Sequence, residues 1–297
     1  MRNTLLFMLG AALLLPAHAA LNVFACEPEW ASLVRELGGD KVNVYAATHA
    51  LQDPHRIEAR PSLIARARGA QLLVCTGAEL EAGWLPSVLR ESGNAAVQPG
   101  QPGYFEAAQQ VERLEVPARL DRAEGDVHAA GNPHIQLDPR NLLAVAAALA
   151  RRLGEVDGVN AGHYAARQQA FAGKMRAALA RWETEAAGLR GARVVAQHKS
   201  FSYLLRWLGL VEAGTLEPKP GIEPGSAHLA SLLGQIRAQP VRLILRAPFD
   251  SPRPGEWLAE RSKAPLVTLP FTVGGSEGAS DLFGLFDDTL ARLKAAP

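Results

Sequence analysis

Short strand-like runs alternate with amphipathic helical patterns in two separate parts of this 297-residue sequence. The first part begins with the runs Leu21–Ala25 and Val42–Ala46, and the second with Arg193–Ala196 and Val211–Thr215. Such alternation is typical of parallel sheets with helices on their faces. The sequence therefore predicts the α/β class, with two lobes that each contain a parallel sheet.

The remaining expected elements follow the same alternation. In the first lobe they are a strand at Gln71–Cys75 and helices at Glu29–Leu37, Pro61–Arg68 and Trp84–Arg90. In the second lobe they are strands at Arg242–Arg246 and Leu266–Thr268 and helices at Ser200–Leu208, Ser226–Arg237 and Gly255–Arg261. The helices that begin near Trp30 and Phe201 share an aromatic start, leucine spacing and a closing glycine. This weak internal repeat suits two halves of similar topology.

The region between the lobes has no strand signal. It predicts one alanine-rich helix at Asn141–Leu153 and a longer one at Val159–Leu189, which has apolar residues at helical spacing. At 1.5 Å per residue the longer helix would run roughly 45 Å, so we expect it to be a rigid strut. The expected divisions are 1–19, 20–140, 141–190 and 191–297 for the signal peptide, first lobe, connecting helices and second lobe.

The first residues resemble a secretory signal peptide. Arg2 precedes the apolar run Leu5–Leu15, and the small residues Ala17 and Ala19 predict cleavage before Ala20. The apolar run is too short to span a bilayer. No cysteine follows the cleavage site directly, so we expect no lipid anchor there. The simplest compartment for the mature chain is a bacterial periplasm.

Charge is nearly balanced, with 31 basic and 30 acidic residues. This balance gives no electrostatic case for binding nucleic acid or anionic membranes. Only Cys26 and Cys75 are present, both near the ends of strand-like runs. An exported chain favours a disulfide between them, which would add roughly 2–4 kcal/mol if the strands are neighbours. Two small buried apolar residues are the alternative.

Three histidines lie in short polar turns that each follow a strand-like run. They are His55 in Asp53-Pro54-His55, His134 in Asn132-Pro133-His134 and His198 in Gln197-His198-Lys199. One such histidine is easily an ordinary surface residue. Three in comparable turns suit imidazoles that converge on one borderline-soft metal ion.

Four segments together resemble the zinc and manganese solute-binding proteins of ABC transporters. They are Gln52–Ser62, Asn132–Asn141, Gln197–Tyr203 and Glu217–Pro224, in the order that the family has them. The resemblance implies two α/β lobes joined by one long helix, with a metal site in the cleft between the lobes. It also implies import of the metal through a membrane permease, by a protein that we expect to be a monomer.

Carried over to this chain, the resemblance makes His55, His134 and His198 metal ligands. It places a carboxylate ligand near the C-terminus, for which Asp281 is the first choice and Glu277, Asp287 and Asp288 compete. His128 lies in a short loop where zinc-binding relatives often carry a long histidine-rich insertion. It is either an accessory ligand that captures metal or a solvated loop residue.

Metal choice follows from the ligand types. Three imidazoles and one carboxylate suit four-coordinate Zn²⁺, whereas Mn²⁺ prefers more oxygen donors. Manganese-carrying relatives tend to have a glutamate at the position of His198. We therefore expect a periplasmic zinc-binding protein that delivers Zn²⁺ to an ABC permease, loaded from solution or by a metallochaperone. The alternative within the family is a manganese-binding protein.

A zinc-dependent hydrolase is the alternative from another class, because three histidines with an open position also activate water. The sequence lacks a His-Glu-x-x-His motif and a Gly-x-Ser-x-Gly motif, so we do not expect an enzyme. Asp53 and Asp138 are expected to make supporting or capping contacts rather than to bind metal. The proline-rich segment that begins at Glu217 is expected to restrain the backbone near the cleft.

Overall fold

The computed structural model describes residues 19–119 and 128–296. Residues 1–18 of the expected signal peptide lie outside this range, and so do residues 120–127 before His128. Among the described helices, none has the length and apolar character needed to cross a membrane.

Each lobe contains one four-stranded, fully parallel sheet. The strand orders are β2-β1-β3-β4 and β6-β5-β7-β8, so the two sheets have the same topology. This agrees with the weak repeat in the sequence. The strands are β1 (Leu21–Ala25), β2 (Val42–Ala46), β3 (Leu72–Cys75), β4 (Tyr104–Glu106), β5 (Arg193–Ala196), β6 (Val211–Thr215), β7 (Leu243–Arg246) and β8 (Leu266–Thr268).

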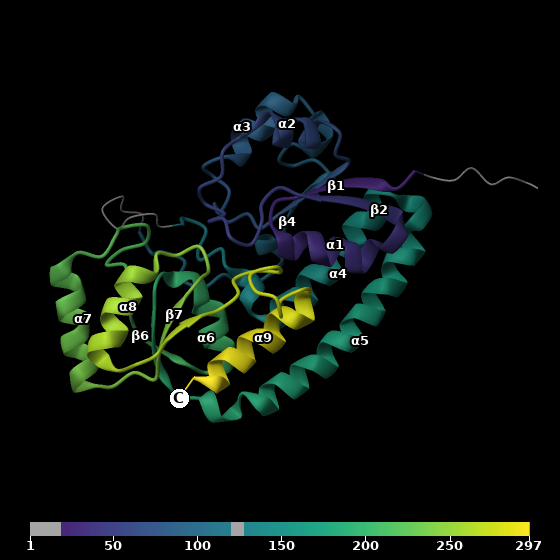
Figure 1. Cartoon of the computed structure of the whole chain (residues 1–297). Coiled ribbons are helices and arrows are strands. Elements are labelled where there is room, and N and C mark those ends of the chain that lie inside the picture. Colours follow the sequence, from purple (N-terminus) through teal and green to yellow (C-terminus); the bar gives the residue numbers. More distant parts are fainter. Residues whose placement is uncertain (1–18, 120–127, 297) are drawn as a thin grey trace, which may run out of the picture.

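Helices cover the faces of both sheets and connect the lobes (Figure 1). They are α1 (Pro28–Gly38), α2 (Pro61–Arg68), α3 (Leu85–Ser92), α4 (Pro139–Val156), α5 (Ala161–Glu185), α6 (Ser202–Leu208), α7 (Ser226–Ala238), α8 (Pro252–Ser262) and α9 (Leu282–Ala295). Five of them, α1, α2, α3, α4 and α8, have proline in the first turn. Proline suits that position because the first backbone N–H groups have no partner within the helix. The prediction of an α/β fold with two lobes is confirmed.

One continuous apolar core runs through both lobes. It contains alternate residues of the first strand of each sheet, such as Val23 and Val194, and the apolar faces of α4, α5 and α9. Two smaller cores lie on the other faces of the sheets, around Trp84 in the first lobe and Leu232 in the second. The shared core fixes the lobes to each other, since packed interiors do not deform continuously.

Helix α5 is the strut that joins the lobes, and Figure 1 shows it running along both of them. Its 25 residues span about 37 Å at 1.5 Å per residue, which is shorter than expected because 3-10 turns flank both ends. Near its start, Arg167 donates to the Glu36 carbonyl at 2.6 Å. Near its end, Trp182 packs against Phe286 with ring centroids 5.0 Å apart. The predicted interlobe helix is confirmed.

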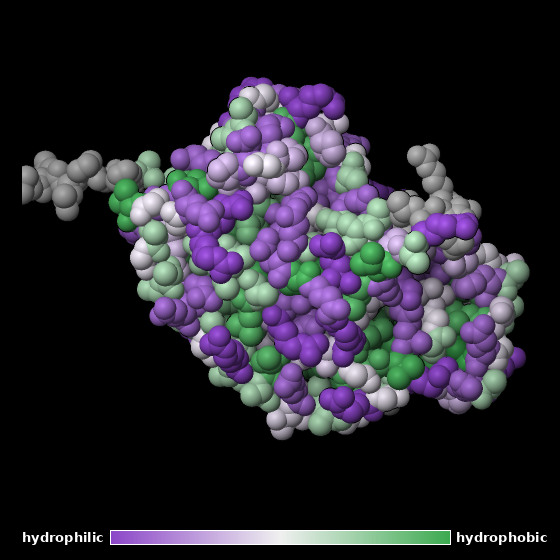
Figure 2. Space-filling view, turned by 180° about the vertical axis from the view of Figure 1, so that it is seen from behind, coloured by the Kyte–Doolittle hydropathy of each residue, from purple (hydrophilic) through white to green (hydrophobic). Residues whose placement is uncertain are grey.

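The opposite face of the molecule carries hydrophilic residues spread between small hydrophobic patches (Figure 2). This mixture agrees with the balanced charge of the sequence. On α5, Met175 is fully buried in the shared core, and His163 lies 2.8 Å from the Gly38 carbonyl through its Nε2. Both side chains thus serve packing and hydrogen bonding.

The short strand β4 is absent from the sequence prediction. It pairs in parallel with β3 and ends the first sheet, in register from Leu73 opposite Tyr104. A three-residue run gives too little apolar pattern to be recognised without its neighbour.

Cys26 and Cys75 form a disulfide, with Cα atoms 4.8 Å apart. Cys26 follows the last residue of β1, and Cys75 is the last residue of β3. These two strands are neighbours and pair in parallel, as the prediction required. Both cysteines are completely buried. The predicted disulfide is therefore present, and it closes a loop that includes β2 and α2.

Candidate metal centre

His55 lies in the turn region between β2 and α2. The Asp53 carboxylate accepts the His55 backbone N–H at 3.0 Å and lies 2.7 Å from the ring Nδ1. This local turn is one that aspartate favours. Pro54 fixes the turn further, because its carbonyl accepts the Trp84 indole N–H at 3.0 Å. The His55 ring is thus held by its own turn and by the core of the first lobe.

His134 lies in the equivalent turn before α4. The Asn132 side chain accepts the His134 backbone N–H at 2.9 Å and donates to the Lys199 carbonyl at 2.8 Å. Tyr203 donates to the Asn132 carbonyl, also at 2.8 Å. The turn that carries His134 is therefore bonded to the second lobe next to His198.

His198 lies two residues after the end of β5. Its Nδ1 lies 2.8 Å from Oε2 of Glu217, which follows β6 in the same sheet. Because β5 and β6 are parallel neighbours, their carboxyl ends meet at one edge. That placement brings Glu217 to His198.

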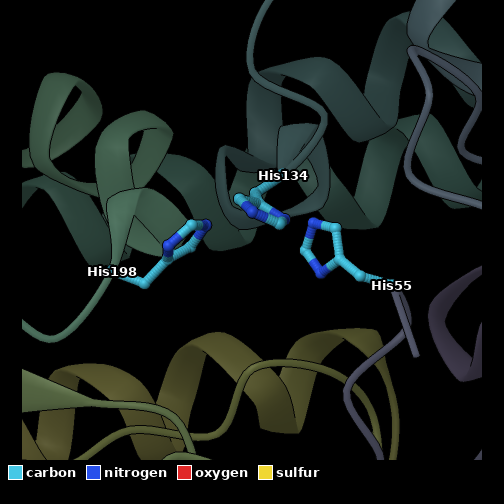
Figure 3. A group of neighbouring side chains, drawn as sticks. All are labelled: His55, His134 and His198. Atoms are coloured by element: carbon cyan, nitrogen blue, oxygen red, sulfur yellow. The ribbon is translucent and has the colours of Figure 1, made fainter. Parts of the chain in front are cut away.

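The three histidines converge at the cleft between the lobes (Figure 3). One ligand nitrogen from each lies within 4.8 Å of the other two. Their ring centroids are separated by 5.4 Å for His55 and His134, 6.0 Å for His55 and His198, and 5.7 Å for His134 and His198. Residues 79 and 64 positions apart in the sequence thus meet at one point.

His134 is the most buried of the three, with 1% of its surface exposed. Within residues 19–119 and 128–296, neither of its ring nitrogens has a hydrogen-bond partner, and its ring lies edge-on to Phe271 at 5.3 Å. A buried polar atom without a partner is costly, so these two nitrogens suit the binding of a cation. Burial and the neighbouring histidines hold the pKa of His134 well below 6.5. The ring is therefore neutral, which is the form that binds metal.

His198 has the opposite electrostatic environment. Burial acts to lower its pKa, but the hydrogen bond and charge of Glu217, with Asp250 and Asp53 nearby, raise it above 6.5. Asp250 lines a small cavity with His55, His198 and Glu217, and burial raises the pKa of its carboxyl group to about 6. The cleft thus combines imidazoles with acidic groups, as a cation site requires.

His128 lies against His55, with their Nε2 atoms 3.3 Å apart and their rings stacked. Burial, together with His55 and His198, lowers the pKa of His128 to about 4. The Glu79 carboxylate accepts the N–H of Ala129, which fixes the backbone beside His128. A cavity of about 270 Å³ is lined by His128, His134 and His198 together with Glu115, Asn132, Pro133, Lys199 and Pro220.

Asp281 is in a different environment. Its Oδ1 accepts the backbone N–H groups of Phe283 at 2.9 Å and Gly284 at 2.8 Å, so it caps α9, and the residue is exposed. Among the described residues, the group of possible metal ligands at the cleft contains the three histidines and not Asp281.

The competing carboxylates of α9 also have partners. Asp287 accepts from Trp182 at 2.6 Å, and Asp288 accepts from Arg292 at 2.6 Å. Asp138 caps α4 through the Arg140 N–H, as expected. Sequence reasoning missed Asp250 and the contact between Glu217 and His198. The available signal was that both lie in segments that follow strands of the second sheet, Glu217 after β6 and Asp250 after β7.

Two other histidines make local contacts. His49 accepts the Leu51 N–H at 3.3 Å, and His228 lies 2.9 Å from the Thr215 carbonyl through its Nε2.

Residues 23–296 match the family described as ZnuA, zinc-uptake complex component A, periplasmic. A similar curated protein is the metal ABC transporter substrate-binding lipoprotein ScbA of Streptococcus cristatus, at 22% identity over 88% of this chain and 84% of that protein. Another is the high-affinity zinc uptake system protein ZnuA of Brucella abortus, at 24% identity over 44% of this chain and 39% of that protein.

Solved structures give the same fold. The crystal structure of ZnuA has a TM-score of 0.75 and 21% identity, over 92% of this chain and 99% of that one. The Mn-bound periplasmic metal binding protein from candidatus Liberibacter asiaticus also has a TM-score of 0.75, at 17% identity over 93% and 99% of the two chains. The predicted family resemblance is confirmed.

Proposed function

This chain belongs to the family of zinc-uptake complex component A, the substrate-binding proteins of metal ABC transporters, and on that premise we propose that it carries Zn²⁺. In this proposal the protein acts in the periplasm as a monomer, after the signal peptide has been cleaved off before Ala20. It takes the ion from solution or from a metallochaperone and delivers it to a membrane permease. The family consists of solute-binding proteins, so the proposal involves no catalytic turnover.

The observation that supports the proposal most is the convergence of His55, His134 and His198 within 4.8 Å. We propose that all three bind the ion. The unpartnered nitrogens of His134 would gain a ligand, and the neutral state of its ring leaves a lone pair free for that ligand. Ligands from both lobes would close around one ion.

The fourth donor has two candidates. Two nitrogens bound to one tetrahedral zinc, each at about 2.0–2.1 Å, lie roughly 3.3–3.4 Å apart. The distance between His55 Nε2 and His128 Nε2 is 3.3 Å, so we propose His128 as the fourth donor in this conformation. Asp281, the choice from the sequence, would first have to leave its capping position on α9.

Zinc is preferred over manganese in this proposal because the donors are imidazoles. Nitrogen donors and four-coordination suit zinc, and zinc also stands above manganese in the usual affinity order. Manganese stays the second candidate, since relatives include the manganese ABC transporter substrate-binding lipoprotein scaA of Streptococcus gordonii.

Metal analysis of the purified mature chain tests the proposal. We expect one zinc per wild-type chain, retained in the presence of excess Mn²⁺, and loss of that zinc in His198→Ala. His228→Ala is the matched control, because His228 contacts the Thr215 carbonyl rather than the cleft, and it should keep the zinc. Wild-type protein that holds no zinc, or that exchanges it readily for Mn²⁺, would contradict the proposal.

A hydrolase assay with fluorogenic esters and amides distinguishes the metal carrier from the alternative, a zinc-dependent hydrolase. The carrier predicts no zinc-dependent turnover. Turnover that disappears on chelation and in His198→Ala would instead establish an enzyme.

A further inference from the structure

The three cleft histidines differ in what holds the ring nitrogen that faces away from the cleft. His55 has the Asp53 carboxylate at 2.7 Å and His198 has the Glu217 carboxylate at 2.8 Å, both on Nδ1. His134 has no partner on either nitrogen among the residues that the structure describes. Each lobe therefore contributes one histidine that is paired with a carboxylate.

Glu217 is itself held firmly. The Oε2 that contacts His198 also accepts the Gly221 N–H at 2.8 Å. The Glu217 backbone N–H donates to the Gln197 carbonyl at 3.0 Å, directly before His198, and its carbonyl accepts the Thr215 hydroxyl at 2.7 Å. The carboxylate and the imidazole thus share one rigid set of backbone contacts.

A carboxylate beside Nδ1 has a defined chemical effect on the imidazole. It accepts the proton of Nδ1–H, so the lone pair stays on Nε2, and it makes that nitrogen a stronger donor. Three neutral imidazoles would leave the charge of a bound dication uncompensated. Asp53 and Glu217 would supply two negative charges, each one hydrogen bond away from an imidazole that would bind the ion.

We propose that Glu217 is a positioning residue for the metal site, which fixes the tautomer and orientation of His198 and supplies compensating negative charge from the second lobe. The proposal rests on the proposed zinc-binding function. It gives the loop that begins at Glu217 a direct part in metal affinity, beyond restraint of the backbone.

The test compares Glu217→Gln with wild type and with Glu223→Gln. Glu223 is an exposed acid in the same loop, so its substitution changes the loop charge without touching His198. Zinc affinity is measured by competition with a chromophoric chelator at pH 8 and at pH 6. At pH 8 we expect Glu217→Gln to bind zinc about 10- to 100-fold more weakly, and Glu223→Gln to match wild type.

At pH 6 the loss in Glu217→Gln should be smaller than at pH 8. The same carboxylate stabilises a proton on His198, so in wild type the proton competes with zinc more strongly at low pH. Asp53 and Asp250, which also face His198, are unchanged in this variant. A purely structural defect would weaken binding by the same factor at both pH values.

The proposal is overturned if Glu217→Gln binds zinc as tightly as wild type at pH 8. It is also overturned if the zinc affinity of Glu217→Gln falls by the same factor at both pH values. If Glu217→Gln does not fold, Glu217→Asp carries the same test, since its shorter side chain keeps the charge but withdraws it from Nδ1. Failure of the zinc-binding function itself is distinguishable, because then wild type and Glu223→Gln would not bind zinc either.

Discussion

Two groups of titratable side chains in this protein contain members whose pKa values burial shifts in opposite directions. The first is the histidine cleft, formed by His55, His134, His198 and His128. The second is the acid cluster, by which we mean Glu27, Glu29 and Glu81, with 2%, 1% and 3% of their surface exposed. Both groups contain polar atoms without hydrogen-bond partners.

Burial acts on the two groups with opposite sign. In the cleft it lowers the pKa of His134 and His128, so lone pairs become available to a cation. In the acid cluster burial raises the pKa of Glu27 well above 4.5, and those of Glu29 and Glu81 to about 7. The acids therefore keep their protons to a higher pH than exposed glutamates do, because ionised groups are costly to bury.

The partners of the two groups also differ. Glu81 accepts the Thr76 N–H at 2.7 Å, Glu27 accepts the Thr76 hydroxyl at 3.0 Å, and Glu29 accepts the Thr272 hydroxyl. These bonds join β3, α1 and the segment after β8. The comparison teaches that burial leaves nitrogen lone pairs free in one group and holds protons on carboxyl groups in the other.

The largest expected effect separates the two groups directly. His134→Ala should reduce zinc affinity by more than about 100-fold, since loss of a ligand exceeds the 10- to 100-fold effect of an outer contact. Glu29→Gln should leave zinc affinity within a few-fold of wild type. Isothermal titration of both variants checks the contrast. A strong loss of zinc affinity in Glu29→Gln would break the distinction between metal site and structural cluster.

Removal of the disulfide sharpens the structural side of the comparison. Replacement of Cys26 and Cys75 by alanine should lower the free energy of unfolding by about 2–4 kcal/mol, mainly because the unfolded chain gains freedom. Zinc affinity of the folded protein should be unchanged. Denaturant titration and zinc competition together measure both quantities. Loss of zinc binding in protein that is still folded would tie the disulfide to the metal site.

In metal-free protein the acid cluster should contribute a loss of stability with rising pH, and the lowered pKa values of His134 and His128 should contribute a gain. Because the folded-state pKa of Glu81, about 7, is above the ordinary glutamate value of 4.5, the contribution of Glu81 to stability is lost as pH rises from about 4.5 to 7. Glu81→Gln, which resembles the protonated acid, should reduce this loss by roughly 1–3 kcal/mol. Urea unfolding of wild type and Glu81→Gln at pH 5 and pH 8 measures this difference in the loss of stability. An unchanged pH slope in the variant would show that Glu81 is already ionised.

The smallest expected effect concerns Asp281. As a helix cap, Asp281→Ala should lower the free energy of unfolding by about 1 kcal/mol and leave zinc affinity nearly unchanged. His128→Ala should do the reverse, with weaker zinc binding and little change in stability. Zinc competition and thermal unfolding of the pair decide the fourth donor. Zinc affinity that falls strongly in Asp281→Ala would restore the carboxylate to the site.

Much of the fold could be predicted because local signals were strong. The helix Pro61–Arg68 and the strand Arg193–Ala196 have the predicted ends, set by a proline and by a buried apolar run. The strand β4 could not be predicted, since it depends on pairing with β3 rather than on its own three residues.

The candidate site was predictable to the extent that its residues follow strands. His55 follows β2 and His198 follows β5, and parallel sheets bring the turns after strands to one edge. His134 differs from the prediction, because it lies before α4 and far along the chain from the end of β4. The role of Asp281 was harder to predict, because an aspartate before an apolar helix is equally a capping residue. The pairing of Glu217 with His198 depends on the register of β5 and β6, which one sequence does not reveal.

Anomalous diffraction at the zinc absorption edge, from crystals of the mature chain grown with one equivalent of Zn²⁺, tests the central claim most directly. We predict one strong peak between the lobes, about 2.0–2.1 Å from a nitrogen of each of His55, His134 and His198. A peak elsewhere, or zinc bound by histidines of only one lobe, would contradict the account.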